Sequence, residues 1–272
     1  MRGLAGRRGG VLPWQRWGAA ARAAVVALVG IVACGIAPAA VAGTPAAAPP
    51  ATAQAVLERM DAAARDLRDM SARLTLEATD ARGRRARSVL LVAFIREPAL
   101  ARLEIREPSA LSGQVYVLDG AAREMRLYLP VTHQIVVQRL DEATPAPVAP
   151  EHLLKSVVDE QAEPSLRLVG TEQAGGTPLY VLEASIPSLG AAPGVDVNLP
   201  GMPVPSLGDI PADGGSVRIW VDGSSWLPIR FVVYDRRGGQ RASLSLTEVR
   251  INQKLRPEEL RRLPEDAEMV EG

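Results

Sequence analysis

Cysteine and histidine are almost absent from this chain of 272 residues. It contains one cysteine, Cys34, and two histidines, His133 and His152. A single cysteine cannot form an internal disulfide framework or a zinc site built on several thiolates. The histidines stand nineteen positions apart, without the H-x-x-x-H spacing of a zinc site. We therefore expect no metal and no cofactor.

The sequence also lacks the common signatures of catalysis. It has no G-x-S-x-G elbow and no glycine-rich phosphate loop before a helix. The acidic pair Glu258-Glu259 lies in a charged terminal segment, which is typical of a solvated surface. Asp222 and Asp235 adjoin turns, and we predict that they accept hydrogen bonds from turn backbone groups. The sequence thus predicts a protein that is not an enzyme.

Acidic residues are missing from the first 42 positions. This segment carries five arginines and an apolar run over 23–33, which together are typical of a secretory signal. The run is short for a bilayer span of about 20 residues, although an extension to Val41 leaves an uncleaved anchor open. Without residues 1–42 the chain has 26 basic and 31 acidic residues, a net charge of −5. That charge does not favour binding to nucleic acid.

Two processing sites fit the end of this signal. Ile31-Val32-Ala33-Cys34-Gly35 matches a bacterial lipobox, in which Cys34 is acylated. The alternative is cleavage after Ala42, an A-x-A site that would leave Cys34 inside the signal. Residues 35–52 are mostly Ala, Pro, Gly, Val and Thr, which suits either a tether or a disordered N-terminus. We expect an exported protein of the periplasm or cell envelope, with anchoring through Cys34 left open.

Residues 53–272 are predicted to form one mainly β domain of the α+β class. An amphipathic helix is expected over 54–70 and a second helix over 151–160, because apolar residues recur there at helical spacing. About eleven strands are expected, and most of them alternate apolar and polar residues. The nearly continuous apolar run 88–95 indicates a strand covered on both faces. A turn is expected over 171–178, and short connections favour antiparallel pairing.

The segment 187–215 is rich in proline and glycine, yet leucine, valine, methionine and isoleucine recur through it. A loop this long without secondary structure is unusual in a compact domain and is commonly functional or disordered. A flexible lid over an apolar cavity is one interpretation. A surface insertion without such a role is the other, and the sequence leaves both open.

The order of the C-terminal segments resembles the outer-membrane lipoprotein carrier and sorting family, the LolA-like proteins. The segment Trp220-Val221-Asp222 followed by Leu227-Pro228 is similar to the family's "WvD…LP" pattern. Pro98 to Glu104 is similar to its "P-x-x-x-R-x-E" strand. Tyr116 to Gly120 and Met125 to Pro130 are similar to the turn and the strand that follow. The resemblance covers about residues 53–268.

The resemblance implies a curved antiparallel sheet that forms an unclosed β-barrel with covering helices. It also implies that one face of the sheet holds lipid, or the acyl chains of lipoproteins, for transport or sorting. The partners implied are a membrane-associated donor or acceptor protein, and we expect a monomer. Related folds serve as envelope sensors of the anti-sigma type, so a regulatory binding module is the alternative. Either strand phase could face inward, and the candidate cavity residues are Leu74, Leu76, Leu90, Val92, Phe94, Leu103, Ile105, Leu127, Leu244 and Leu246.

Overall fold

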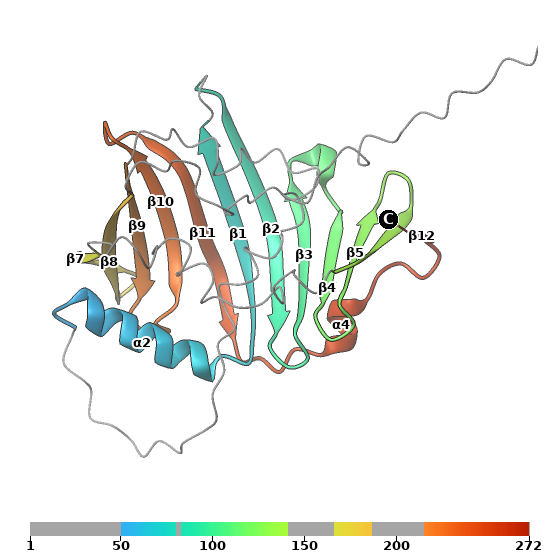
Figure 1. Cartoon of the computed structure of the whole chain (residues 1–272), viewed down its shortest axis with the longest axis horizontal. Coiled ribbons are helices and arrows are strands. Elements are labelled where there is room, and N and C mark those ends of the chain that lie inside the picture. Colours follow the sequence, from blue (N-terminus) through green and yellow to red (C-terminus); the bar gives the residue numbers. More distant parts are fainter. Residues whose placement is uncertain (1–49, 80–82, 141–165, 187–214, 272) are drawn as a thin grey trace, which may run out of the picture.

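One sheet of twelve strands makes up most of the described protein. The computed structural model describes residues 50–79, 83–140, 166–186 and 215–271, and the sheet curves across Figure 1. The strand order is β12-β6-β5-β4-β3-β2-β1-β11-β10-β9-β8-β7, so β12 and β7 are edges and the sheet does not close. The strands are β1 (Asp69–Thr79), β2 (Arg85–Ile95), β3 (Leu100–Glu107), β4 (Val115–Asp119), β5 (Glu124–Leu129), β6 (Gln134–Arg139), β7 (Arg167–Ala174), β8 (Thr177–Ile186), β9 (Gly215–Asp222), β10 (Pro228–Asp235), β11 (Gln240–Ile251) and β12 (Glu268–Glu271).

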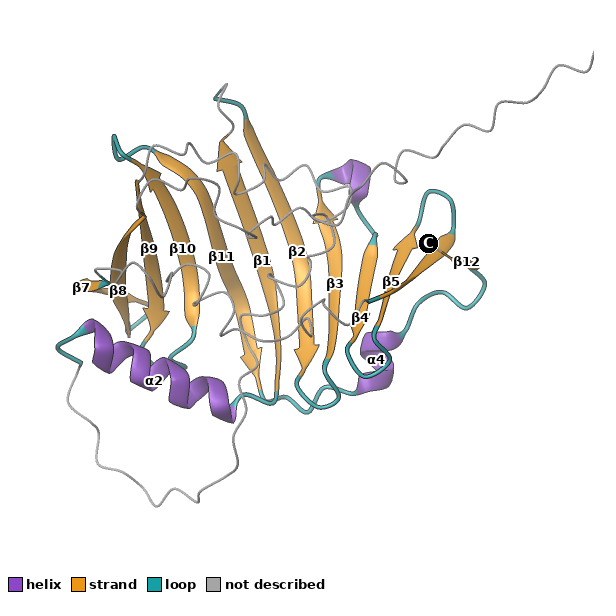
Figure 2. Cartoon of the chain, in the orientation of Figure 1, coloured by secondary structure: helices purple, strands orange, loops and turns teal. Residues whose placement is uncertain are grey.

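The predicted fold class, an unclosed and mainly β sheet, is confirmed. Strands β1 to β11 pair antiparallel with one another, and β1 joins β11 across the centre. The twelfth strand was not predicted, and it lies parallel to β6 at the edge. Figure 2 shows the two α-helices of the described chain at the same end of the sheet, α2 (Ala53–Asp66) and α4 (Pro257–Arg261).

Helix α2 is shorter than the sequence predicted. The Thr52 hydroxyl caps its first turn by accepting a hydrogen bond from the Ala55 N–H at 3.2 Å. The prediction of a helix to residue 70 was wrong, because the chain becomes extended at Leu67 and Met70 belongs to β1. Leu67 and Met70 both enter the core beneath the sheet, so their apolar spacing continues the helical pattern without a helix. The Arg96 guanidinium donates to the carbonyls of the last helical turn.

A network of hydrogen bonds joins the end of α2 to the end of β11. The Asn252 side chain accepts from the Arg68 N–H at 2.8 Å and donates to the Asp66 carbonyl at 3.2 Å. The Asp69 carboxylate is 5% exposed and accepts from the N–H groups of Gln253 at 2.7 Å and Lys254 at 3.0 Å. The helix, the first strand and the C-terminal segment therefore meet at one buried carboxylate.

The turn between β7 and β8 is shorter than expected. The sequence predicted a turn over 171–178, but β7 continues to Ala174 and β8 begins at Thr177. Gly175 and Gly176 have φ of 58° and 85°, a left-handed backbone that glycine adopts without a steric penalty. The two glycines are therefore sufficient to reverse the chain. The predicted helix 151–160, the signal 1–42, Cys34 and most of segments 35–52 and 187–215 lie outside the described residues.

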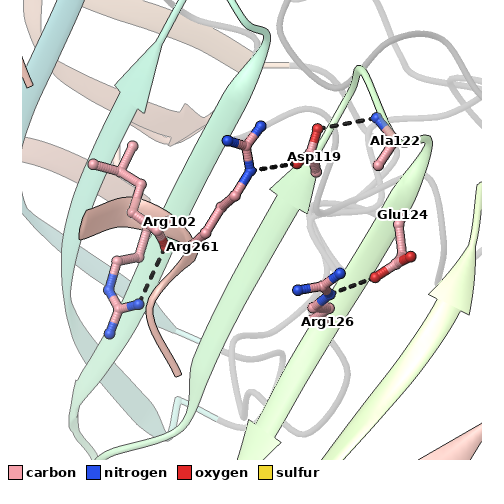
Figure 3. Close-up of polar contacts among 7 residues, drawn as sticks. Arg102, Asp119, Ala122, Glu124, Arg126 and Arg261 are labelled. Atoms are coloured by element: carbon pink, nitrogen blue, oxygen red, sulfur yellow. Dashed lines mark hydrogen bonds and ion pairs between the residues drawn. The ribbon is translucent and has the colours of Figure 1, made fainter. Parts of the chain in front are cut away.

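The C-terminal segment crosses the other side of the sheet and is held there by arginines (Figure 3). Arg102 donates to the carbonyls of Leu260 at 3.3 Å and Arg262 at 2.6 Å. Arg261 donates to the Asp119 carboxylate at 2.7 Å. Burial opposes ionisation of Asp119, but the bonds from Arg261 and from turn N–H groups outweigh it and lower the pKa of this carboxyl. Leu260 packs near Ile95, so the predicted covering of 88–95 on both faces is confirmed at this end of β2.

Candidate apolar binding face

The ten candidate cavity residues gather on one side of the sheet. We call this side the apolar face, defined by their common cluster with Leu67, Met70, Tyr116 and Leu118. Residues that pair across neighbouring strands lie on the same side of a sheet. Leu246 pairs with Leu74, Leu74 with Leu90, and Leu90 with Ile105. The strand phase that the sequence left open is therefore common to all ten. Seven are buried (Leu74, Leu76, Leu90, Phe94, Leu103, Ile105 and Leu246), and three are partly buried and pack against them (Val92, Leu127 and Leu244).

The apolar face continues toward β8, where α2 covers it. Leu244 pairs with Phe231 of β10, which leads into a second cluster on β8, β9 and β10. Val56 and Met60 of α2 pack into this second cluster and are 0% and 6% exposed. Helix α2 runs across the ends of β9, β10 and β11 in Figure 1. The apolar face thus spans the sheet from β8 to β5, with the helix over one part of it.

Two polar side chains interrupt the apolar face. Ser88 is 0% exposed, stands opposite Leu76, and its hydroxyl has no hydrogen-bond partner among the described residues. Tyr116 is also 0% exposed, and burial raises the pKa of its phenol far above the ordinary value. Neither residue was among the ten predicted cavity residues. Ser88 was detectable as the one hydroxyl in the apolar run 88–95, whereas Tyr116 resembles an ordinary strand aromatic.

The C-terminal aromatic residues divide between the two sides of the sheet. Trp226 stacks on Tyr180 with ring centroids 5.2 Å apart, and Arg59 of α2 lies 4.7 Å from the centroid of Trp226. Trp220 is on the other side, where its indole N–H donates to Glu172 at 3.1 Å. Trp226 therefore lies where α2 meets the sheet, and Trp220 does not contribute to the apolar face.

The predicted turn acids act as expected. Asp222 accepts from the N–H groups of Ser224 at 3.1 Å and Ser225 at 2.7 Å. Asp235 accepts from the N–H groups of Arg237 at 2.9 Å and Gly239 at 2.8 Å. Burial of Asp222 opposes its ionisation, but the bonds from Ser224 and Ser225 outweigh burial and lower the pKa of this carboxyl. Both carboxylates hold hairpin turns, so neither is a candidate for catalysis.

His133 is on the β5–β6 turn and contacts the C-terminal segment. One ring nitrogen is 3.2 Å from the Asp266 carboxylate, and the other is 3.1 Å from the Tyr128 hydroxyl. Within the described ranges, no three His, Cys, Asp or Glu side chains come together as metal ligands. Neither α2 nor α4 has the length and apolar character needed to cross a membrane. His152 lies outside the described residues.

Comparisons with known proteins find similar solved structures. No protein-family model and no curated protein matches the sequence. The chain is similar to an uncharacterized conserved protein from Thermus thermophilus at 20% identity, over 81% of this chain and 99% of that one, with a TM-score of 0.49. It is similar to a LolA superfamily protein from Nitrosomonas europaea at 15% identity, over 78% of this chain and 99% of that one, with a TM-score of 0.33.

A third similar structure is the complex of MucA and MucB from Pseudomonas aeruginosa. The identity is 15%, the match covers 79% of this chain and 62% of that one, and the TM-score is 0.46. These matches include the superfamily that the sequence motifs resemble. At these identities and TM-scores the similarities say nothing about what this chain binds.

Proposed function

We propose that this protein is an extracytoplasmic binding protein that holds lipid, or the acyl chains of lipoproteins, on its apolar face for transport or sorting. The observation that carries the proposal is the continuity of this face across an unclosed sheet. Its register runs from Leu246 through Leu74 and Leu90 to Ile105 without a charged residue. A face of this kind suits a ligand that is long, flexible and apolar.

The binding energy needs no polar contacts. Each methylene that leaves water contributes about 0.8 kcal/mol, so ten methylenes supply roughly 8 kcal/mol before the entropy of ordering the chain is subtracted. The inner side chains are already buried, with Leu90 at 0% and Leu103 at 1% exposure. An acyl chain must therefore enter beside the partly buried side chains of Val92, Leu127 or Leu244 and separate existing apolar contacts.

Neighbouring residues on β11 allow a matched test of this proposal. Leu244 is on the apolar face, whereas Ser245 follows it and points to the other side. Leu244→Trp should fill the space beside this partly buried position and reduce binding of a fluorescent fatty acid by about tenfold. Ser245→Trp should leave binding unchanged. Circular dichroism and thermal unfolding of both variants establish that they fold, because overpacking costs about 1–3 kcal/mol.

The outcomes separate lipid binding from the alternative function. Equal binding by the two variants would place the lipid elsewhere and contradict the proposal. Failure of the unmodified protein to bind any fatty acid or phospholipid would also contradict it. In that case, a stable membrane-protein partner recovered with an empty apolar face would favour the regulatory module.

A further inference from the structure

Arginines are concentrated at the tips of two hairpins. The end of the β1–β2 hairpin (residues 77–87) and the end of the β10–β11 hairpin (residues 235–241), which we call the basic hairpins, carry six described arginines and two described carboxylates. Their net charge is therefore +4, although residues 43–272 together have a net charge of −5. Such a concentration is unfavourable within the protein, because like charges repel. The residues are Arg84, Arg85, Arg87, Arg236, Arg237 and Arg241, with Glu77 and Asp235.

The basic hairpins lie side by side at one end of the sheet. Ala78 near the end of β1 pairs with Ala86 of β2 on one side and with Ala242 of β11 on the other. Strands β2, β1, β11 and β10 are consecutive in the sheet, so the two tips span about 15 Å at an ordinary strand spacing. Figure 1 shows the end of β1, the start of β2 and the β10–β11 turn at the upper end of the sheet, opposite to α2.

Only some of these arginines form ion pairs within the protein. Arg241 pairs with Asp235 at 2.8 Å, and Arg87 lies 4.0 Å from Glu77 and 3.6 Å from Glu107. The carboxylates are thus engaged with these two arginines, and Asp235 also holds its turn. No carboxylate of the described residues forms an ion pair with Arg85, Arg236 or Arg237, and all three are exposed. Their charge faces solvent and is accessible to an anionic partner.

An apolar residue is exposed at the same end of the sheet. Strand β5 runs toward this end, and Val131 at the β5–β6 turn is 88% exposed. The arginines would contact a layer of anions, and the exposed valine would contact an apolar layer beneath it. An anionic bilayer has both features. An acidic protein groove would not require the exposed valine.

We infer that the basic hairpins dock the protein end-on to an anionic lipid surface. Arginine suits phosphate headgroups because its planar guanidinium donates two parallel hydrogen bonds. In this orientation α2 lies at the end of the sheet far from the bilayer, and the basic hairpins face the bilayer. The docking depends on the hairpins and not on the cargo, so it can fail independently of the proposed lipid binding.

Vesicle sedimentation with the full chain tests this inference. The probes are phosphatidylcholine vesicles with and without about 30% phosphatidylglycerol, since anionic lipid supplies the attraction. The test variant changes Arg84, Arg85, Arg236 and Arg237 to Gln. The control variant changes Arg139, Arg250, Lys254 and Arg262 to Gln, which removes the same charge elsewhere. The apolar run 23–33 is common to all three proteins, so its contribution cancels in the comparison.

We expect the unmodified protein and the control to prefer anionic vesicles and the test variant to lose that preference. Each arginine near an anionic surface contributes about fivefold, so four additive substitutions should lower partitioning by about 600-fold. Raising NaCl from about 0.1 to about 1 M shortens the Debye length from roughly 10 to roughly 3 Å and should abolish the preference. Equal partitioning of test and control variants, or equal binding to neutral and anionic vesicles, would overturn the inference.

Discussion

Replacement of Asp69 by asparagine tests the junction between α2, β1 and the C-terminal segment. Each carboxylate oxygen accepts one backbone N–H, from Gln253 and from Lys254. Asparagine keeps the shape and one accepting oxygen, but its amide nitrogen would face the second N–H. One buried N–H is then left without an acceptor, and donor faces donor.

The expected cost is about 2–3 kcal/mol, because a hydrogen bond to a charged group contributes about 1.5–3 kcal/mol and the site is buried. For a domain of this size that corresponds to a fall in Tm of roughly 5–10 °C. Urea unfolding followed by circular dichroism should show a lower midpoint with an unchanged slope.

Asp66→Asn is the matched control, since Asp66 is exposed at the end of the same helix. We expect it to change the free energy of unfolding by less than about 0.5 kcal/mol. If the two variants unfold at the same urea concentration, the buried carboxylate does not hold the junction, and the reasoning is refuted.

Two further predictions concern the polar residues of the apolar face. Ser88→Ala should raise the free energy of unfolding, measured by urea unfolding, by about 1 kcal/mol. The substitution removes a buried hydroxyl that has no partner among the described residues. A loss of stability would show that this hydroxyl has a partner in solution. Burial raises the pKa of Tyr116, so above pH of about 10 the unfolded chain releases this proton while the folded chain keeps it. Stability should fall by up to about 1.4 kcal/mol per pH unit there, and Tyr116→Phe should remove this dependence. An identical pH profile for the phenylalanine variant would contradict the assignment.

Alternation along the strands predicted the sheet and the membership of the apolar face. A period of two places Leu74 and Leu76, or Leu90 and Val92, on a common side whatever the tertiary structure. The pattern could not relate one strand's side to the next, because that depends on cross-strand register. The pairing of Leu246 with Leu74 joins residues far apart in the sequence. That all ten candidates line a lipid cavity stays a prediction.

The errors have physical causes of their own. The predicted helix ran to Met70 because Leu67 and Met70 keep a helical spacing. The Arg96 side chain that contacts the end of α2 comes from a turn distant in the sequence. Strand β7 was cut short because it is exposed along nearly its whole length and shows no apolar alternation. Strand β12 has four residues, with Met269 71% exposed, and depends on its pairing with β6.

The pairing of β1 with β11 has a consequence for how the chain reaches its native state. These two strands form the centre of the sheet, yet Leu76 and Leu244 are partners from nearly opposite ends of the domain. Contacts between such distant segments slow folding, because a long loop must close first. Until β11 arrives, β1 presents an open edge that can pair with another chain. The central contact thus forms only after nearly the whole polypeptide is available, so partially synthesised chains are exposed to aggregation.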